Sequence, residues 1–355
     1  MVDSKHQWKA WLYLLPAIIL LLIFTVWPIL NTVRMAFTVY WDPNAPAGYD
    51  EDGMQICDED GNPLWGAYKG YTIATDIGNK KLDDDDPNKI QFEFGLDNFK
   101  TVLNYDGFWV IMRNTVLLCV LTVPLSTFLA LLIAVCLNAI KPLRRLLQTI
   151  FFLPYVTNSI AIGMVFAAMF NIVGVVPSDL ASSTSIGIVN TVIGFFGIDP
   201  INWINQGSSY WANIAVMVIY IVWNALPFKI LILLGGLQSV NKQYYDAAKV
   251  DSTPKWRVFT RITVPLLSPM IAYVVITGFI GGFKEYTSIV GIFGESMQPP
   301  GASVGVPVLQ TMVGYIYANL GNAEGIASAA ALLLFLLIFA VTLVNLAVSK
   351  KKTHY

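Results

Sequence analysis

The chain has 355 residues, of which 55% are hydrophobic and only 13% charged, and its formal net charge is −1. The apolar residues come in blocks of about 20, the length that crosses a lipid bilayer, so the sequence predicts a membrane protein rather than a soluble two-domain protein. Its two histidines, His6 and His354, lie at the termini, and the cysteines Cys57, Cys119 and Cys136 share no short spacing. Histidine-based catalysis, a zinc site and a disulfide framework are therefore not expected.

The first apolar run covers residues 11–29 and follows Lys5 and Lys9. It is too long for the hydrophobic part of a signal peptide, and no small-residue cleavage site follows, so it predicts a membrane-spanning helix. Five further runs are long enough to cross a bilayer, at residues 114–137, 150–170, 212–234, 266–283 and 326–348. The predicted fold class is all-α, a polytopic membrane protein with six transmembrane helices in one domain, residues 11–348.

The segment at residues 35–108 is rich in turn residues and holds 15 of the 23 carboxylates, including the acidic run 83–86. Asp-Gly pairs at 52–53 and 60–61 indicate short strands and hairpins in an insertion within the membrane domain. Residues 58–62 faintly resemble a calcium-binding loop, but the later bidentate Glu is missing. A solvated acidic hairpin is the better interpretation.

The connection at residues 174–203 is rich in Gly, Ser, Asn and Asp, as expected for an external loop. A short re-entrant or interfacial helix is predicted within it at 188–196. This loop could face a docking protein.

The fourth run contains polar groups beside a proline, at residues 223–229. An amide and an ammonium within the hydrocarbon layer are unfavourable unless they face the bundle interior or water. One interpretation is a solute pathway lined by Trp223, Asn224 and Lys229. The other is that Asn224 bonds a neighbouring helix while Lys229 extends to the inner membrane surface. The sequence favours neither.

The fifth run carries Gly278 and Gly282, four residues apart, which predict close packing with a neighbouring helix. Further pathway candidates follow directly, where aromatic and hydrogen-bonding side chains meet near the outer half of the membrane: Phe283, Glu285 and Tyr286. The sixth run begins with small residues, which also suit tight helix contact.

Residues 239–265 form a polar interruption between the fourth and fifth runs. They begin with a predicted helix that has Ser239 or Asn241 as its N-cap. Residues 251–253 then break the helix, and Pro254 suits the first position of a second one. We therefore expect two short helices that meet at an elbow.

Each of these two helices has a distinct surface. In the first, Ala247 and Ala248 leave the backbone accessible between Asp246 and Asp251, so that a partner surface can approach closely. In the second, large apolar residues recur every three positions between cations, the pattern of a helix at a membrane surface. These apolar residues are Trp256, Phe259 and Ile262.

Lysine and arginine are distributed unequally between the two sides of the predicted membrane domain. They gather in the N-terminal segment, the second connection, the stretch 239–265 and the C-terminal tail, whereas residues 171–210 have none and the fifth connection has only Lys284 near its start. Because positive charges favour the cytoplasmic side, both termini and the elbow are predicted to be cytoplasmic. The insertion at 35–108 is then extracytoplasmic.

The stretch at residues 244–265 resembles the cytoplasmic signature of the permease subunits of binding-protein-dependent ABC importers. In that family the signature reads Glu-Ala-Ala, two residues, Asp-Gly-Ala, and then a spaced Phe, Ile and Pro. Asp246 stands at the Glu position, and the other matching residues are Ala247, Ala248, Asp251, Phe259, Ile262 and Pro265. Ser252 replaces the Gly, which is less favourable by about 1 kcal/mol if the elbow needs a left-handed residue.

Three shorter stretches, 95–99, 113–115 and 152–155, resemble the carbohydrate-importing branch of that family, the maltose and glycerol-3-phosphate type. The resemblance implies half of a translocation pathway for a sugar, oligosaccharide or related solute, in the cytoplasmic (inner) membrane of a bacterium or archaeon. It implies as partners a second permease subunit, commonly a different chain, two ABC ATPase subunits inside and a solute-binding protein outside. The implied coupling residues are Asp246, Ala247, Ala248, Asp251, Ser252, Trp256 and Phe259.

The chain has no phosphate-binding loop, so it is not expected to be an enzyme that hydrolyses ATP, and no cofactor or nucleic acid is expected. The alternative function is a secondary transporter driven by an ion gradient. Such a protein would want carboxylates within the membrane, but the six runs contain none, and Glu285 lies at a boundary. Aromatic and neutral polar groups favour a sugar as the solute, with Trp223 stacking on its ring, whereas Lys229 also suits an anionic phosphate ester.

Overall fold

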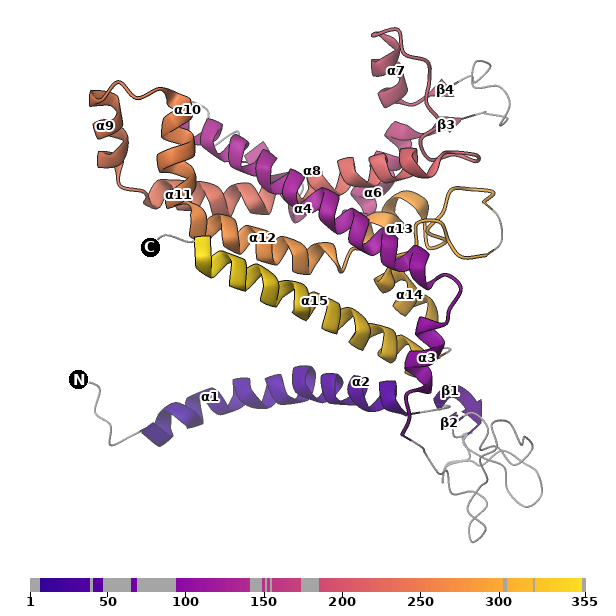
Figure 1. Ribbon diagram of the computed structural model, residues 1–355. Coiled ribbons are helices and arrows are strands. Elements are labelled where there is room, and N and C mark those ends of the chain that lie inside the picture. The colour runs from indigo at the N-terminus through magenta and orange to yellow at the C-terminus, as the bar shows by residue number, and fades with distance from the viewer. Residues whose placement is uncertain are drawn as a thin grey trace, which may run out of the picture. The chain divides into compact units, whose positions relative to one another are not determined.

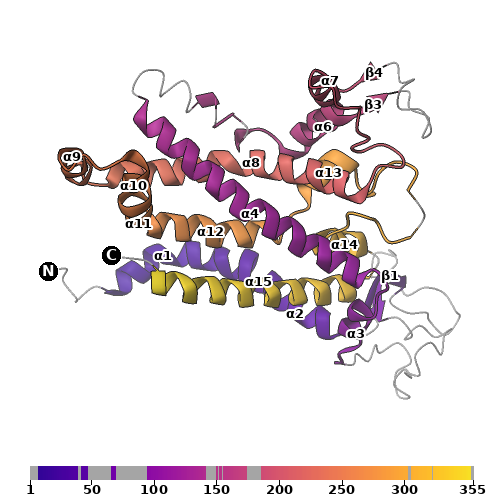
Figure 2. The same ribbon diagram turned by 45° about the horizontal axis from the view of Figure 1, so that its top comes forward.

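A computed structural model of the chain describes residues 7–38, 41–46, 65–68, 94–140, 149–150, 152–153, 155–173, 185–302, 305–321 and 323–352. The chain divides into two compact units. The first comprises Met1–Phe108 and Tyr315–Leu334, and the second comprises Trp109–Gly314 and Phe335–Tyr355. The described secondary structure is almost entirely helical, which confirms the all-α prediction (Figures 1 and 2).

The first unit begins with a long helix in three segments, α1 (Gln7–Leu21), the π-helical η2 (Leu22–Val26) and α2 (Trp27–Phe37). The predicted run at residues 11–29 is helical, but the helix continues until Thr38 adopts an extended backbone. From Trp11 onward its side chains are mostly apolar and almost all exposed. A helix in contact with lipid has this character.

The side-chain amide of Asn98 closes the end of α2. Asn98 lies in α3 (Asp97–Leu103), is buried, and donates from Nδ2 to the carbonyl oxygen of Ala36 at 3.1 Å. Such a carbonyl has no partner within a helix that ends there. Gly325, in α15 (Glu324–Lys352), faces the same amide, because a Cβ at Gly325 would lie 2.7 Å from Asn98 Nδ2. Gly325, directly before the sixth predicted run, therefore does allow a close approach.

Two short strands, β1 (Trp41–Pro46) and β2 (Trp65–Tyr68), pair antiparallel. They belong to the insertion at 35–108, for which the sequence predicts short strands. The acidic run 83–86 and the calcium-loop-like residues 58–62 lie outside the described residues.

The second unit is built on α4 (Phe108–Ala139), α8 (Tyr210–Ser239) and α12 (Ser268–Gly282). One apolar cluster joins these three helices. A second cluster joins α4 and α8 to α6 (Ser159–Phe170) and α13 (Thr287–Phe293). Figure 1 shows α4 passing across α8. These two clusters hold the helices that surround the candidate site.

Four helices in the described chain are long and apolar enough to cross a membrane: Trp11–Phe37, Phe108–Ala139, Tyr210–Ser239 and Glu324–Ser349. A fifth span results if Lys255–Leu266 and Ser268–Gly282, which are bent by 69°, count as one. The third predicted run, 150–170, is not one continuous helix, because Asn158 has an extended backbone and caps α6. The number of six spans thus stays a prediction.

The loop between α6 and α8 contains β3 (Ile172–Val173), β4 (Ser185–Ile186) and α7 (Ile188–Gly194). The two strands pair antiparallel. The short helix predicted at 188–196 is confirmed, and it ends two residues earlier.

Asn114 ties the N-terminal end of α4 to the segment that precedes α14 (Met312–Asn319). Asn114 has no exposed surface, and its Nδ2 donates to the carbonyls of Val308 at 2.9 Å and Gln310 at 3.0 Å. Its Oδ1 accepts a hydrogen bond from the hydroxyl of Tyr210 at 2.8 Å. The side-chain amide of Asn114 thus joins α4, α8 and the segment before α14.

Replacing Asn114 with Leu is expected to lower the free energy of unfolding by about 1–3 kcal/mol, because the carbonyls of Val308 and the buried Gln310 and the hydroxyl of Tyr210 lose this partner. Thr101→Val is a matched control, since the hydroxyl of Thr101 is exposed and bonds only its own helix. Unfolding midpoints of the two purified variants measure the difference. Equal unfolding midpoints for the two variants would contradict the role of Asn114 in joining these segments.

Candidate functional site: a polar cavity and a two-helix elbow

The polar stretch after α8 forms two helices joined by an elbow. α9 (Lys242–Val250) comes first, and α10 (Lys255–Val258) continues into η4 (Phe259–Thr263) and α11 (Val264–Leu266). Between them Ser252 has a φ of +51°, in the left-handed region. The elbow is therefore present as predicted, with a left-handed serine where the resembled signature has glycine.

Of the two predicted N-caps Asn241 is confirmed, whereas the position of Pro254 differs from the prediction. Ser239 ends α8, and Asn241 is the N-cap of α9, its Oδ1 accepting a hydrogen bond from the backbone N–H of Gln243 at 3.0 Å. Val240 has an extended backbone that separates the two helices. Pro254 precedes α10 as its N-cap instead of occupying the first helical position, because its ψ of 143° is extended.

The predicted coupling residues differ in exposure. Exposed are Asp246, Ala247, Asp251, Ser252 and Trp256. Phe259 is half-buried, and Ala248 is only 5% exposed. The expectation that both alanines leave the backbone open is wrong for Ala248, which faces the interior of the chain. Asp246 Oδ1 accepts a hydrogen bond from Lys249 Nζ at 3.0 Å, in an exposed ion pair.

Replacing Ser252 with Gly is expected to raise the free energy of unfolding by about 1 kcal/mol, because glycine adopts a positive φ without a clash of its Cβ. Thr253→Gly is the control, since Thr253 does not have a positive φ, and it should not stabilise. Thermal unfolding of the purified variants measures both effects. A lower midpoint for Ser252→Gly would exclude the left-handed elbow.

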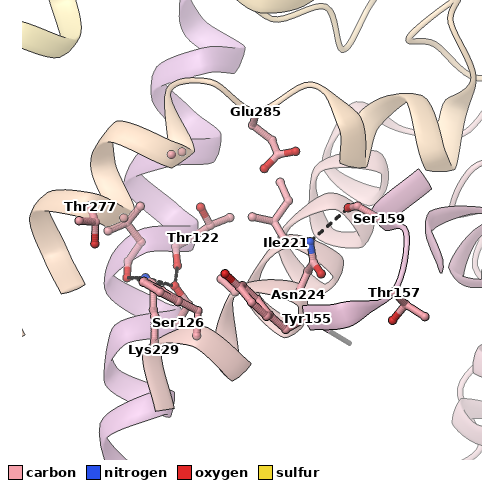
Figure 3. A pocket seen from close by; sticks show the side chains of 16 residues that line it. Thr122, Ser126, Tyr155, Thr157, Ser159, Ile221, Asn224, Lys229, Thr277 and Glu285 are labelled. Atoms are coloured by element: carbon pink, nitrogen blue, oxygen red, sulfur yellow. Dashed lines mark hydrogen bonds between the residues drawn. The ribbon is translucent and has the colours of Figure 1, made fainter. Parts of the chain in front are cut away.

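A cavity of about 470 Å³ lies between α4, α8, α12 and the chain just before α6. Figure 3 shows its lining. Its polar lining residues are Thr122, Ser126, Tyr155, Thr157, Ser159, Asn224, Lys229, Thr277 and Glu285. Of the six pathway candidates from the sequence, the structure brings three into this lining: Asn224, Lys229 and Glu285.

Lys229 is buried, with 5% of its surface exposed, and it points to α4. Its Nζ donates to Ser126 Oγ at 2.7 Å, to Thr127 Oγ1 at 3.0 Å and to the Val123 carbonyl at 3.3 Å. Within the described residues no carboxylate forms an ion pair with it. The interpretation that Lys229 extends to the membrane surface is therefore wrong, because hydroxyls of α4 provide its hydrogen bonds inside the protein (Figure 3).

Gly278 and Gly282 bring α12 close to α4. A Cβ at Gly278 would lie 3.0 Å from Val123 Cγ1 and 3.2 Å from Lys229 Nζ, and a Cβ at Gly282 would lie 2.9 Å from Cys119 Sγ. All three distances are shorter than an ordinary contact, so any side chain would push the helices apart. The predicted packing role of this pair is confirmed.

Asn224 and Glu285 face the cavity from opposite sides (Figure 3). Asn224 Nδ2 donates to Ser159 Oγ at 3.2 Å, so it bonds a neighbouring helix and also lines the cavity. The interpretation that Asn224 bonds a neighbouring helix is therefore confirmed, and its place in a solute pathway stays a prediction. One carboxylate oxygen of Glu285 accepts a hydrogen bond from the Ser288 N–H at 3.1 Å, which leaves acceptor positions for a ligand.

An aromatic pair, Tyr155 and Phe228, completes the lining. The two rings are stacked with centroids 6.0 Å apart, and Tyr155 is 57% exposed. Sequence reasoning did not select either residue for the site, although Tyr155 lies in the stretch 152–155 that resembles the carbohydrate branch. Ser159 was also missed, because its local sequence does not indicate that it lines the cavity and contacts Asn224 of α8.

The three remaining pathway candidates lie elsewhere. Trp223 packs on Phe166 with ring centroids 5.1 Å apart and lines a separate cavity of about 350 Å³. Phe283 is buried, and Tyr286 packs against the apolar cluster around α13. None of the three contributes to the polar cavity.

The sequence of this chain matches a known protein family. Residues 124–354 match the binding-protein-dependent transport system inner membrane component family. The arabinooligosaccharides transport system permease protein AraP of Halalkalibacterium halodurans is 30% identical over 263 residues, 73% of this chain and 76% of that protein. The trehalose/maltose transport system permease protein MalF of Thermococcus litoralis is 31% identical over 256 residues, 72% of this chain and 79% of that protein.

A solved structure has the same fold. It is a crystal structure of a bacterial ABC transporter involved in the import of the acidic polysaccharide alginate, and one of its chains aligns with a TM-score of 0.68 at 20% identity, covering 99% of this chain and 98% of that one. The family match extends over the elbow and over α8 and α12 of the cavity. The chain therefore belongs to the family of inner-membrane components of binding-protein-dependent transport systems, and it is a multi-pass permease subunit of an ABC importer.

Proposed function

We propose that this permease forms half of the translocation pathway for a sugar, an oligosaccharide or a related neutral solute. The cavity supports the proposal, because hydroxyl and amide groups surround the same space as the stacked pair Tyr155 and Phe228. Sugars offer hydroxyls to such polar groups, and their apolar faces pack on aromatic rings. The names of AraP and MalF, with arabinooligosaccharides and trehalose or maltose, support the same class of solute.

A neutral solute fits the cavity better than an anionic one. A lysine ammonium has three N–H donors, and Lys229 donates to three acceptors on α4. It therefore has no free donor for a phosphate ester. Glu285 faces the same space, and its ionised form would repel an anion.

We infer that the elbow is the contact with a separate ATPase. Asp246 and Trp256 are exposed on it, and the ion pair between Asp246 and Lys249 is also exposed. Such a pair contributes less than about 1 kcal/mol, so a cation of a partner can replace it. The complete transporter would contain two permease subunits, two ATPase subunits and a solute-binding protein.

The distribution of lysine and arginine supports an orientation with both termini and the elbow in the cytoplasm. The insertion at 35–108 would then lie outside, on the side of the solute-binding protein. Movement of the elbow would reach the cavity through α12, because Lys255–Leu266 is followed directly by Ser268–Gly282. Alternating access of the cavity to the two sides needs such a two-state element.

Reconstitution of the permease with its second subunit, the ATPase and the solute-binding protein tests the function. At least one of maltose, trehalose and arabinotriose is expected to stimulate ATP hydrolysis. Glycerol 3-phosphate and galacturonate are not expected to stimulate it. Uptake should also continue when an ionophore collapses ion gradients. Stimulation by the anions alone, no stimulation by any saccharide, or loss of uptake with the ionophore would each contradict the proposal.

A further inference from the structure

One position in the wall of the cavity lacks a side chain although there is room for one. Gly281 of α12 lines the cavity, and a Cβ built on it would meet no atom within 4 Å. Two other glycines of the same helix, Gly278 and Gly282, also line the cavity, but both contact α4 so closely that a Cβ does not fit. Gly281 is thus the one of the three whose missing side chain is not explained by helix packing.

The backbone gives no other reason for glycine at this position. Gly281 is not among the residues with a positive φ, so alanine could adopt the same conformation. A glycine in a helix is less favourable than alanine by about 1 kcal/mol. Glycine at residue 281 therefore makes the helix slightly less stable than alanine would, at a position that faces open space.

We propose that the missing side chain of Gly281 determines the size of the solute, and that it lets the cavity admit a chain of more than one sugar ring. This inference depends on the proposed function of the cavity as a solute pathway. The cavity volume of about 470 Å³ lies within the range of sites that enclose ligands larger than a single ring. Gly281 is exposed in the wall of this space, and the open surroundings of its Cβ leave room there for a large side chain.

The experiment uses the reconstituted complex with its binding protein and two neutral series, maltose to maltopentaose and arabinobiose to arabinopentaose. The wild-type protein is compared with Gly281→Ala, Gly281→Leu and Gly281→Phe. Stimulation of ATP hydrolysis by the longest effective saccharide should fall stepwise with side-chain size, by about tenfold or more for Phe, whereas the shortest effective saccharide should change less than about twofold.

Gly235→Phe is the matched control. Gly235 lies in α8, is exposed, and also has no atom within 4 Å of a built Cβ, but it does not line the cavity. The same substitution there should leave the dependence on saccharide length unchanged. Gly281→Ala should also preserve assembly, whereas Gly282→Ala should weaken it, because its Cβ would lie 2.9 Å from Cys119 Sγ.

The outcomes separate this inference from the function on which it depends. If the wild-type complex responds to oligosaccharides and the length dependence is unchanged in Gly281→Phe, the inference alone is wrong. It is also wrong if Gly235→Phe shifts the length dependence equally, or if Gly281→Phe fails to assemble, since residue 281 would then contact another subunit. If the wild-type complex responds to no saccharide, the proposed function fails and the inference fails with it.

Discussion

Charge reversal on the elbow, by Asp246→Lys or Asp251→Arg, is expected to abolish transport-coupled ATP hydrolysis while the permease stays in the membrane. Both side chains are exposed, and substitutions at such positions change stability by less than about 0.5 kcal/mol. At an interface with the ATPase, by contrast, like charges brought together are unfavourable by several kcal/mol. Since each 1.4 kcal/mol is about a factor of ten, coupled hydrolysis should fall by about a hundredfold or more.

Lys249→Ala provides the control for Asp246→Lys. It removes the 3.0 Å ion pair of Asp246 without reversing a charge at residue 246. If the carboxylate acts on the ATPase, Lys249→Ala should keep most of the coupled activity. Equal loss in both variants would show that the pair within α9 is what matters. Membrane fractionation and the uncoupled ATPase rate establish that each variant is inserted and assembled, and normal coupled turnover in the reversed variants would contradict the assignment.

The elbow was predictable because its determinants are local. A polar break, a proline and a capping asparagine follow one another along the chain, and their effects on the backbone depend on adjacent residues. The left-handed conformation at Ser252 follows from the same short stretch. The burial of Ala248 was not predictable in this way, because it depends on how α9 packs against the rest of the chain.

The cavity was only partly predictable, for a physical reason. Helices that are apolar on all sides lack the periodic pattern that identifies an inward face. Trp223 and Asn224 are adjacent in the sequence, yet Trp223 packs on Phe166 and Asn224 faces the cavity. The rotation of α8 about its own axis determines which of the two side chains faces the cavity. The sequence of a single helix does not reveal that rotation. Tyr155 was missed for a related reason, since its stretch precedes a helix whose start lies later than predicted.

The elbow and the cavity share the same two helices. α8 leads into α9 through Val240, and α11 leads into α12 through Leu267, which is 1% exposed. α8 and α12 are also the walls that carry Asn224 and Gly281. A displacement of the elbow would therefore change the spacing of these walls directly, and Lys229 and the close glycines hold both walls to α4.

The hydroxyls around Lys229 are expected to be more important for stability than Lys229 itself. Replacing both hydroxyls in Ser126→Ala/Thr127→Val leaves the buried ammonium with one acceptor, the Val123 carbonyl at 3.3 Å. An uncompensated buried charge is unfavourable by about 3–5 kcal/mol. The double variant should therefore lose that much free energy of unfolding, measured in detergent on the purified complex.

Lys229→Met should rescue this loss. Without the ammonium, Ser126 and Thr127 still donate hydrogen bonds to the Thr122 and Val123 carbonyls, so no buried polar group is left unpaired. Lys229→Met alone should be at least as stable as the wild type. The triple variant, Ser126→Ala/Thr127→Val/Lys229→Met, should be nearly as stable as Lys229→Met. The coupling free energy between Lys229 and the hydroxyl pair is the measured quantity. A loss of several kcal/mol in Lys229→Met alone would instead mean that the ammonium has a carboxylate partner on another subunit, which would place the pathway charge at the subunit interface.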